Sequence, residues 1–165
     1  MTRLRRGILP CMTVLILCAA SVCSCAPENA RTQFRHFTGD GDRKASFTVD
    51  LQDTSAACSA AVTVRFPRKG SPDTLTMDIT WTSPSGVTAS ETVSFPSDYA
   101  ALRQYLRTDR GRSRIRMAAT PSCYDVSWDY RDNIRVSEPG LWQVDIWIHG
   151  NPDAVLGAGI QISSK

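Results

Sequence analysis

The stretch "TLTMDITW" (residues 74–81) alternates apolar and polar side chains without a break. A period of two indicates a β-strand that faces a core on one side and solvent on the other. The polar face of the stretch is made of threonine and aspartate side chains. The apolar face consists of Leu75, Met77, Ile79 and Trp81. We therefore expect these four side chains to point into the core.

The same alternation recurs along much of the chain. It is found in "ASFTVDL" (45–51), "AAVTVRF" (60–66), "CYDVSWDY" (123–130), "LWQVDIWIH" (141–149) and "VLGAGIQIS" (155–163). Turn-forming residues separate these segments, as in "PRKGSPD" (67–73) and "SPSG" (83–86). The pattern predicts an all-β fold, an antiparallel β-sandwich of about eight or nine short strands.

One segment departs from the strand pattern. In "PSDYAALRQYLRTDRG" (residues 96–111), apolar side chains follow one another at helical spacing, at Tyr99, Leu102 and Leu106. Ser97 could cap the start of this helix, and Gly111 could end it. We expect a single short helix that crosses between two strands.

The N-terminal segment has the features of an export signal. Three arginines and no acid precede an apolar run that is too short to span a bilayer, and small residues follow it. The stretch "LILCAASVCSC" (residues 15–25) ends like a bacterial lipobox, in which the final cysteine receives the lipid. We expect residues 1–24 to be removed, residues 25–33 to be a lipidated Cys25 with its tether, and residues 34–165 to form one domain. A plain signal peptide cut near Ala26 is the alternative.

The charge of the chain changes on this cleavage. The whole sequence carries 19 basic and 16 acidic residues, and the signal removes Arg3, Arg5 and Arg6 but no acid. The mature chain is therefore neutral, which argues against nucleic acid as a partner. Cys58 and Cys123 are the cysteines left in the domain. They could form a disulfide in an oxidising envelope, although their sequence surroundings differ.

An arginine cluster stands out between residues 103 and 116. It could form a patch that contacts lipid phosphates, acidic glycans or an acidic protein partner. A solvated surface balanced by acids elsewhere is the alternative. The cluster consists of Arg103, Arg107, Arg110, Arg112, Arg114 and Arg116.

Trp147 is out of phase with the inward positions of its strand, because Trp142 occupies the opposite face. An exposed tryptophan could stack on a sugar or anchor a protein contact. Coverage by another element is the alternative. Neither histidine lies in a metal-ligand or nucleophile motif, so we expect no metal, no cofactor and no catalytic residue.

The C-terminal stretch "PGLWQVDIWIHGNPDAVLGAGIQI" (residues 139–162) resembles the end of the gliding-motility lipoprotein GldH family of the Bacteroidota. Two parts carry the resemblance, the Pro139-Gly140-Leu141-Trp142 start and the Leu156-Gly157-Ala158-Gly159-Ile160 closing strand. The resemblance implies a small outer-membrane lipoprotein without an active site, linked to gliding or to the envelope machinery.

These observations together favour a noncatalytic lipoprotein that is anchored in the outer membrane and is accessory to an envelope assembly. We expect its domain on the periplasmic face, and exposure on the cell surface is the alternative. Its expected partners are the membrane, through the lipid anchor, and envelope proteins. The alternative is a surface lipoprotein that binds glycans through Trp147 and the arginine cluster.

Overall fold

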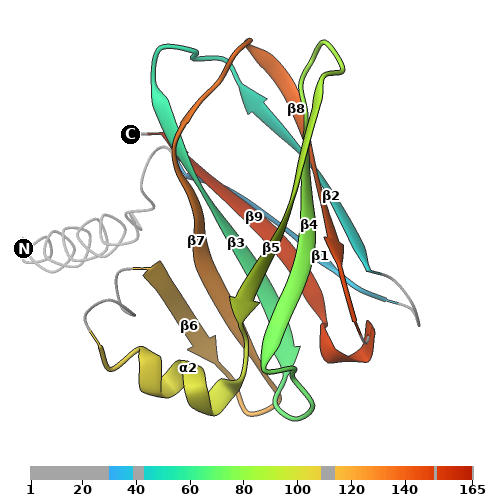
Figure 1. Ribbon diagram of the computed structural model, residues 1–165, viewed down its shortest axis with the longest axis vertical. Helices are drawn as coiled ribbons and strands as arrows, with labels where there is room; N and C mark the ends of the chain where they lie inside the picture. Colours follow the sequence, from blue (N-terminus) through green and yellow to red (C-terminus); the bar gives the residue numbers. More distant parts are fainter. Residues whose placement is uncertain (1–29, 39–42, 109–113, 151, 165) are drawn as a thin grey trace, which may run out of the picture.

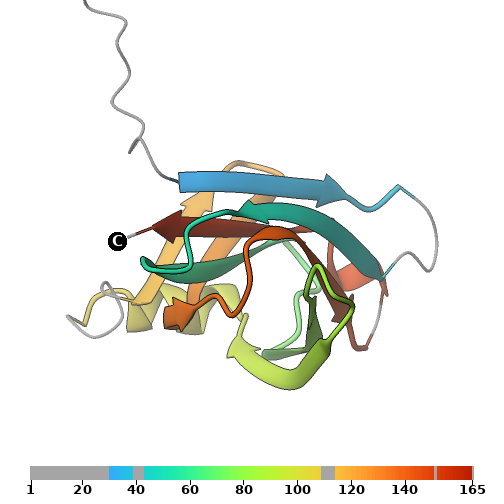
Figure 2. The ribbon, with the colours of Figure 1, turned by 90° about the horizontal axis from the view of Figure 1, so that it is seen from above.

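The computed structural model of the chain describes residues 30–38, 43–108, 114–150 and 152–164. In these residues it confirms the all-β sandwich, with nine strands in two antiparallel sheets and one short α-helix (Figures 1 and 2). The first sheet runs in the order β1 (Ala30–His36), β9 (Gly157–Ser164), β3 (Ala57–Pro67), β7 (Cys123–Arg135), β6 (Ile115–Ala119). The second runs in the order β2 (Lys44–Leu51), β8 (Gly140–Ile148), β4 (Thr74–Thr82), β5 (Thr88–Pro96).

The inner faces of the two sheets form the core. On β4, Leu75, Met77 and Ile79 are buried as the alternation predicts. The central strand β3 contributes Val62, Val64 and Phe66, which are fully buried. Each such side chain stabilises the fold by roughly 1.5–3 kcal/mol through removal of apolar surface from water.

Several apolar side chains at the alternating positions are only partly buried, among them Trp81, which we expected in the core. Trp81, Tyr130 and Trp142 are half-buried, and Leu156 is 38% exposed because β9 begins only after it. The physical reason for the other three is incomplete coverage of one side of the sandwich. Strand β6 pairs only with the first half of β7, from Tyr124 to Trp128.

The second half of β7 also has an irregular register with β3. Ala60 and Ala61 pair with Arg131 and Asp129, so the ladder skips one residue of β7. Asn133 has a φ of 59°, in the left-handed region that asparagine tolerates better than most residues. Such bulges bend a strand and redirect its side chains. Here the bulge lies beside the uncovered side of the sandwich.

The short helix is α2 (Tyr99–Tyr105), which lies beside β6 at one end of the molecule (Figure 1). Its N-cap is Asp98, whose carboxylate accepts a hydrogen bond from the Ala101 N–H at 2.7 Å. The expected cap, Ser97, is instead buried and donates to the Pro72 carbonyl at 2.6 Å. Leu102 is the buried anchor of the helix, as its spacing predicts. The expected end at Gly111 lies outside the described residues.

Strand β1 begins at Ala30, inside the segment that we expected to be a tether. It pairs with β9 along its whole length, from Ala30 opposite Ser163 to His36 opposite Gly157. Two of its side chains also reach the second sheet: Gln33 donates to the Thr48 carbonyl at 2.6 Å, and Arg31 to the Asp50 carbonyl at 2.8 Å. These contacts connect the two sheets on the β1 side, so the uncovered side lies at β5 and β7.

Candidate functional site

A cavity lies between the two sheets on the uncovered side, between β5 and the second half of β7. Its volume is about 310 Å³. Most of its wall is apolar, and the two half-buried tryptophans of β4 and β8 form part of that wall. The apolar lining residues are Leu51, Trp81, Ala89, Ile134, Val136 and Trp142. The polar lining residues are Ser90, Glu91, Arg131 and Arg135. An apolar concave site with a few polar groups is the usual form of a small-molecule site.

An ion pair joins the two sheets at the edge of this cavity. Glu91 of β5 accepts hydrogen bonds from Arg131 of β7, from Nε at 2.9 Å and from Nη2 at 2.7 Å. The Tyr130 hydroxyl donates to the same carboxylate. The hydrogen bond from Arg131 is the main reason why the pKa of Glu91 lies below its ordinary value. Burial and the Glu91 carboxylate raise the pKa of Tyr130 to about 12, so the phenol stays protonated and remains a donor.

The arginine cluster is not one continuous surface in the described residues. Arg103 lies on α2 and Arg107 follows the end of that helix, and both line one shallow hollow beside it. Arg114 and Arg116 flank the start of β6 and line a polar hollow on the outside of the first sheet. Arg110 and Arg112 lie outside the described residues.

Two of these arginines have partners within the fold. Arg116 Nη2 pairs with Asp129 Oδ1 at 2.9 Å, and both side chains are about half exposed. The Arg103 guanidinium lies 5.9 Å from the centroid of the Tyr99 ring. Because both side chains of the Arg116–Asp129 pair are exposed, the pair contributes little to stability, and the Arg116 guanidinium remains accessible to solvent. The described arginines therefore form two separate basic regions.

Trp147 is exposed, at 48% of its surface, on the outer face of the second sheet. Its neighbours across the strands are Lys44 on β2 and Asp78 on β4. Asp78 is held in place by Thr92 at 2.6 Å and by His149 Nε2 at 2.9 Å. The face thus presents one aromatic ring among oriented polar groups, and no other described element covers the ring.

Cys58 and Cys123 are free thiols, so the disulfide that the sequence allowed between them is not formed. Cys58 is opposite Ile134 near one end of the β3–β7 ladder, whereas Cys123 is opposite Pro67 at the other end. Nine residue steps along β3 separate Cys58 from Pro67, which corresponds to roughly 30 Å at strand rise. A disulfide requires Cα atoms within about 7 Å. Burial also raises the pKa of the Cys58 thiol.

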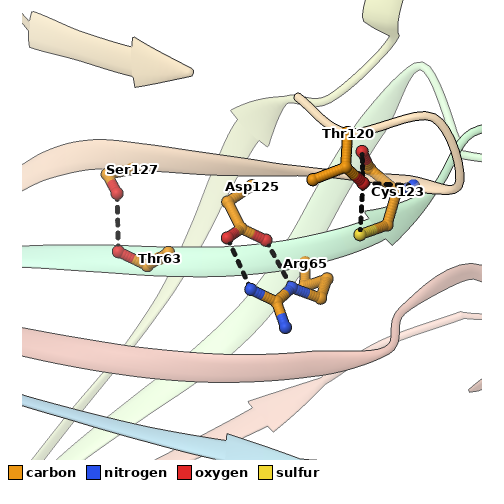
Figure 3. A network of polar contacts seen from close by, with 6 residues as sticks. All are labelled: Thr63, Arg65, Thr120, Cys123, Asp125 and Ser127. Carbon is orange, nitrogen blue, oxygen red and sulfur yellow. Dashed lines mark hydrogen bonds and ion pairs between the residues drawn. The ribbon is translucent and has the colours of Figure 1, made fainter. Parts of the chain in front are cut away.

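The outer face of the first sheet carries a separate polar network (Figure 3). Arg65 on β3 forms a bidentate ion pair with Asp125 on β7, with distances of 2.6 and 2.7 Å. The Cys123 sulfur lies 3.2 Å from the Thr120 hydroxyl, within the same network. Arg65 also lies 5.2 Å from the centroid of the Phe34 ring. These groups satisfy one another across three strands, so we interpret the network as structural.

Phe34 in turn lies on the two glycines of β9. A Cβ atom on Gly157 would lie 2.8 Å from the Phe34 ring, and one on Gly159 would lie 2.7 Å from it. The Gly-Ala-Gly sequence of the closing strand therefore has a local physical reason. It allows the aromatic ring of the edge strand to lie flat against β9.

Among the residues that the structure describes, no three histidine, cysteine or acidic side chains gather into a set that could hold a metal ion. None of the described helices has the length and apolar content needed to cross a bilayer. Cys25, the expected lipidation site, lies outside the described residues.

The sequence matches no protein-family model, and a search of curated proteins finds no match.

Sequence reasoning missed the cavity and its ion pair. The tryptophans at 81 and 142 follow the inward period, so the pattern assigns them to a closed core. Glu91 and Arg131 are 40 residues apart, and neither belongs to a recognisable motif. The sequence carries one signal of this pair. Glu91 lies within "SETVSF" (90–95) and Arg131 directly follows "CYDVSWDY" (123–130), and the inward positions of both segments are otherwise uncharged.

Proposed function

We propose that this chain is a noncatalytic lipoprotein, anchored in the outer membrane through Cys25, whose sandwich domain is an accessory part of an envelope assembly such as the gliding-motility machinery. Membership of the GldH family is part of the proposal. The lipobox and the C-terminal resemblance support it from the sequence.

The observation that carries the proposal is the short distance along the chain between Cys25 and the fold. Strand β1 starts at Ala30, so only four residues separate it from the lipidated cysteine. Even fully extended, five residue steps span at most about 18 Å. The start of β1 would therefore be held within that distance of the lipid headgroups, and the domain could not reach far from the membrane.

The end of the sandwich that would face the membrane carries exposed apolar side chains. Leu141, 62% exposed, is opposite Asp50, and Asp50 contacts Arg31 near the start of β1. Val87, 68% exposed, lies in the turn between β4 and β5 at the same end. Apolar side chains at this end suit a membrane interface, where they would bury themselves beside the headgroups.

The test combines membrane fractionation with crosslinking in the native host. We expect the tagged wild-type protein to be in the outer-membrane fraction and to crosslink to subunits of an envelope assembly, identified by mass spectrometry. Cys25→Ala should abolish both results, whereas the matched variant Cys23→Ala should retain both. Unchanged location and partners in Cys25→Ala would contradict the proposal.

The second candidate function is glycan binding on the outer face of the second sheet. The exposed Trp147 ring beside Asp78 and Lys44 favours it, since aromatic stacking with flanking hydrogen-bonding groups is a common way to hold a sugar. On a glycan array, Trp147→Ala should abolish retention, and Leu141→Ala, which removes another exposed apolar side chain of β8, should not. Equal retention by both variants would exclude this surface.

A further inference from the structure

We propose that the cavity between β5 and β7 binds the hydrocarbon chain of a free fatty acid of medium length, with its carboxylate paired to Arg135. This ligand site is independent of the accessory role proposed above. It rests on the size of the cavity, the chemistry of its wall and the charge at its rim.

The size of the cavity fits one chain. Its volume of about 310 Å³ is at the lower end of the range of ligand sites, roughly 300–1,000 Å³. A methylene group fills about the same space as one water molecule in the liquid, roughly 30 Å³. The cavity therefore has room for about ten carbons, which is a medium-length chain and not a phospholipid with two long chains.

The wall is suited to a hydrocarbon. Trp81 and Trp142 come from neighbouring regions of the second sheet, and Ile134 and Val136 come from the end of β7 and the residue after it. The tryptophans are half-buried, so apolar surface is left for a ligand to cover. Each methylene moved from water into such a site raises the affinity by about fourfold.

The charges at the rim favour an anionic headgroup. The carboxylate of Glu91 is already paired with Arg131 and Tyr130, so it does not leave an unbalanced negative charge. Arg135 is exposed at the cavity, and no described acidic side chain forms an ion pair with it. A carboxylate at the end of an apolar chain would complement this guanidinium, and the planar geometry allows two parallel hydrogen bonds.

The test uses the mature lipoprotein reconstituted in phosphatidylcholine vesicles, with 10-bromodecanoate as the probe, because bromine quenches tryptophan fluorescence on contact. Two of the four tryptophans, Trp81 and Trp142, line the cavity. We expect saturable quenching of up to about half of the emission. The neutral analogue 10-bromodecanol should bind at least tenfold more weakly, a loss of the size expected for a charge-assisted pair.

Two variants separate cavity binding from simple partition into the bilayer. Arg135→Glu should weaken quenching by at least tenfold, whereas Arg107→Glu, a matched change of an exposed arginine away from the cavity, should leave it unchanged. Val136→Phe should fill the cavity and remove saturable quenching, with circular dichroism as the check of folding. Equal quenching of wild type, Arg135→Glu and Val136→Phe would overturn the proposal.

Discussion

Gly159 lies where the edge strand β1 packs tightly against β9, and its replacement by alanine tests whether β9 can carry a side chain at this position. A Cβ atom at this position would lie 2.6 Å from the Gln33 carbonyl oxygen and 2.7 Å from the Phe34 ring. Ordinary van der Waals contact begins at 3.4 Å, so the carbonyl must retreat by about 0.8 Å. Because that carbonyl belongs to the backbone of β1, the whole strand has to move.

The expected cost follows from this displacement. Overpacking of a well-filled site costs typically about 1–3 kcal/mol, and the loss of glycine flexibility in the unfolded chain offsets part of it. We expect Gly159→Ala to lower the free energy of unfolding by about 2 kcal/mol. For a chain of this size, that lowers the melting temperature by about 4–8 °C.

The assay pairs thermal unfolding with hydrogen exchange. Amides of β1 should exchange faster in Gly159→Ala, while amides of β6, on the far edge of the sheet, should not change. The double variant with Phe34→Ala should recover little stability, because removing the ring leaves the carbonyl clash in place. Gly70→Ala is the control, since a Cβ atom there meets nothing within 4 Å and any cost comes from its φ of 88° alone. A Gly159→Ala protein with wild-type melting temperature and wild-type β1 exchange would refute the reasoning.

Three further predictions concern other parts of the molecule. The pKa of Glu91 is lowered in the folded state, so its ion pair with Arg131 stabilises the protein at neutral pH, and this stabilisation is lost as the pH falls through the folded pKa. In thermal melts, Glu91→Gln should therefore lose less stability than wild type between neutral pH and about pH 3. Under non-reducing conditions, an alkylating agent should label the partly exposed Cys123 in the native state and the buried Cys58 only after unfolding, as measured by intact mass spectrometry. A species with a Cys58–Cys123 disulfide would contradict the β3–β7 register. Leu102→Ala should cost about 2–5 kcal/mol in denaturant unfolding because the side chain is fully buried, whereas exposed Gln104→Ala should stay within about 0.5 kcal/mol of wild type.

The cysteines and the arginine cluster show where reasoning from sequence alone fails. Proximity in the chain grouped six arginines, but the helix and β6 place the described members of the group in two regions. The two cysteines could be judged only by compartment and by loop length, both of which allow a disulfide. The β3–β7 register places them at opposite ends of one ladder, and only strand pairing contains that information.

The sequence by itself determined the all-β class, the approximate number of strands and most of the core, whereas the exposure of Trp147 was decided only by the tertiary structure. The physical reason is local: side chains alternate with a period of two on any strand, so the pattern of apolar residues reveals which face is buried. The tertiary structure decided which strands pair, how far β6 extends along β7, and hence that Trp81 and Trp142 border an open cavity. Those features depend on contacts between residues far apart in the chain, such as Glu91 with Arg131, whose geometry no local pattern encodes.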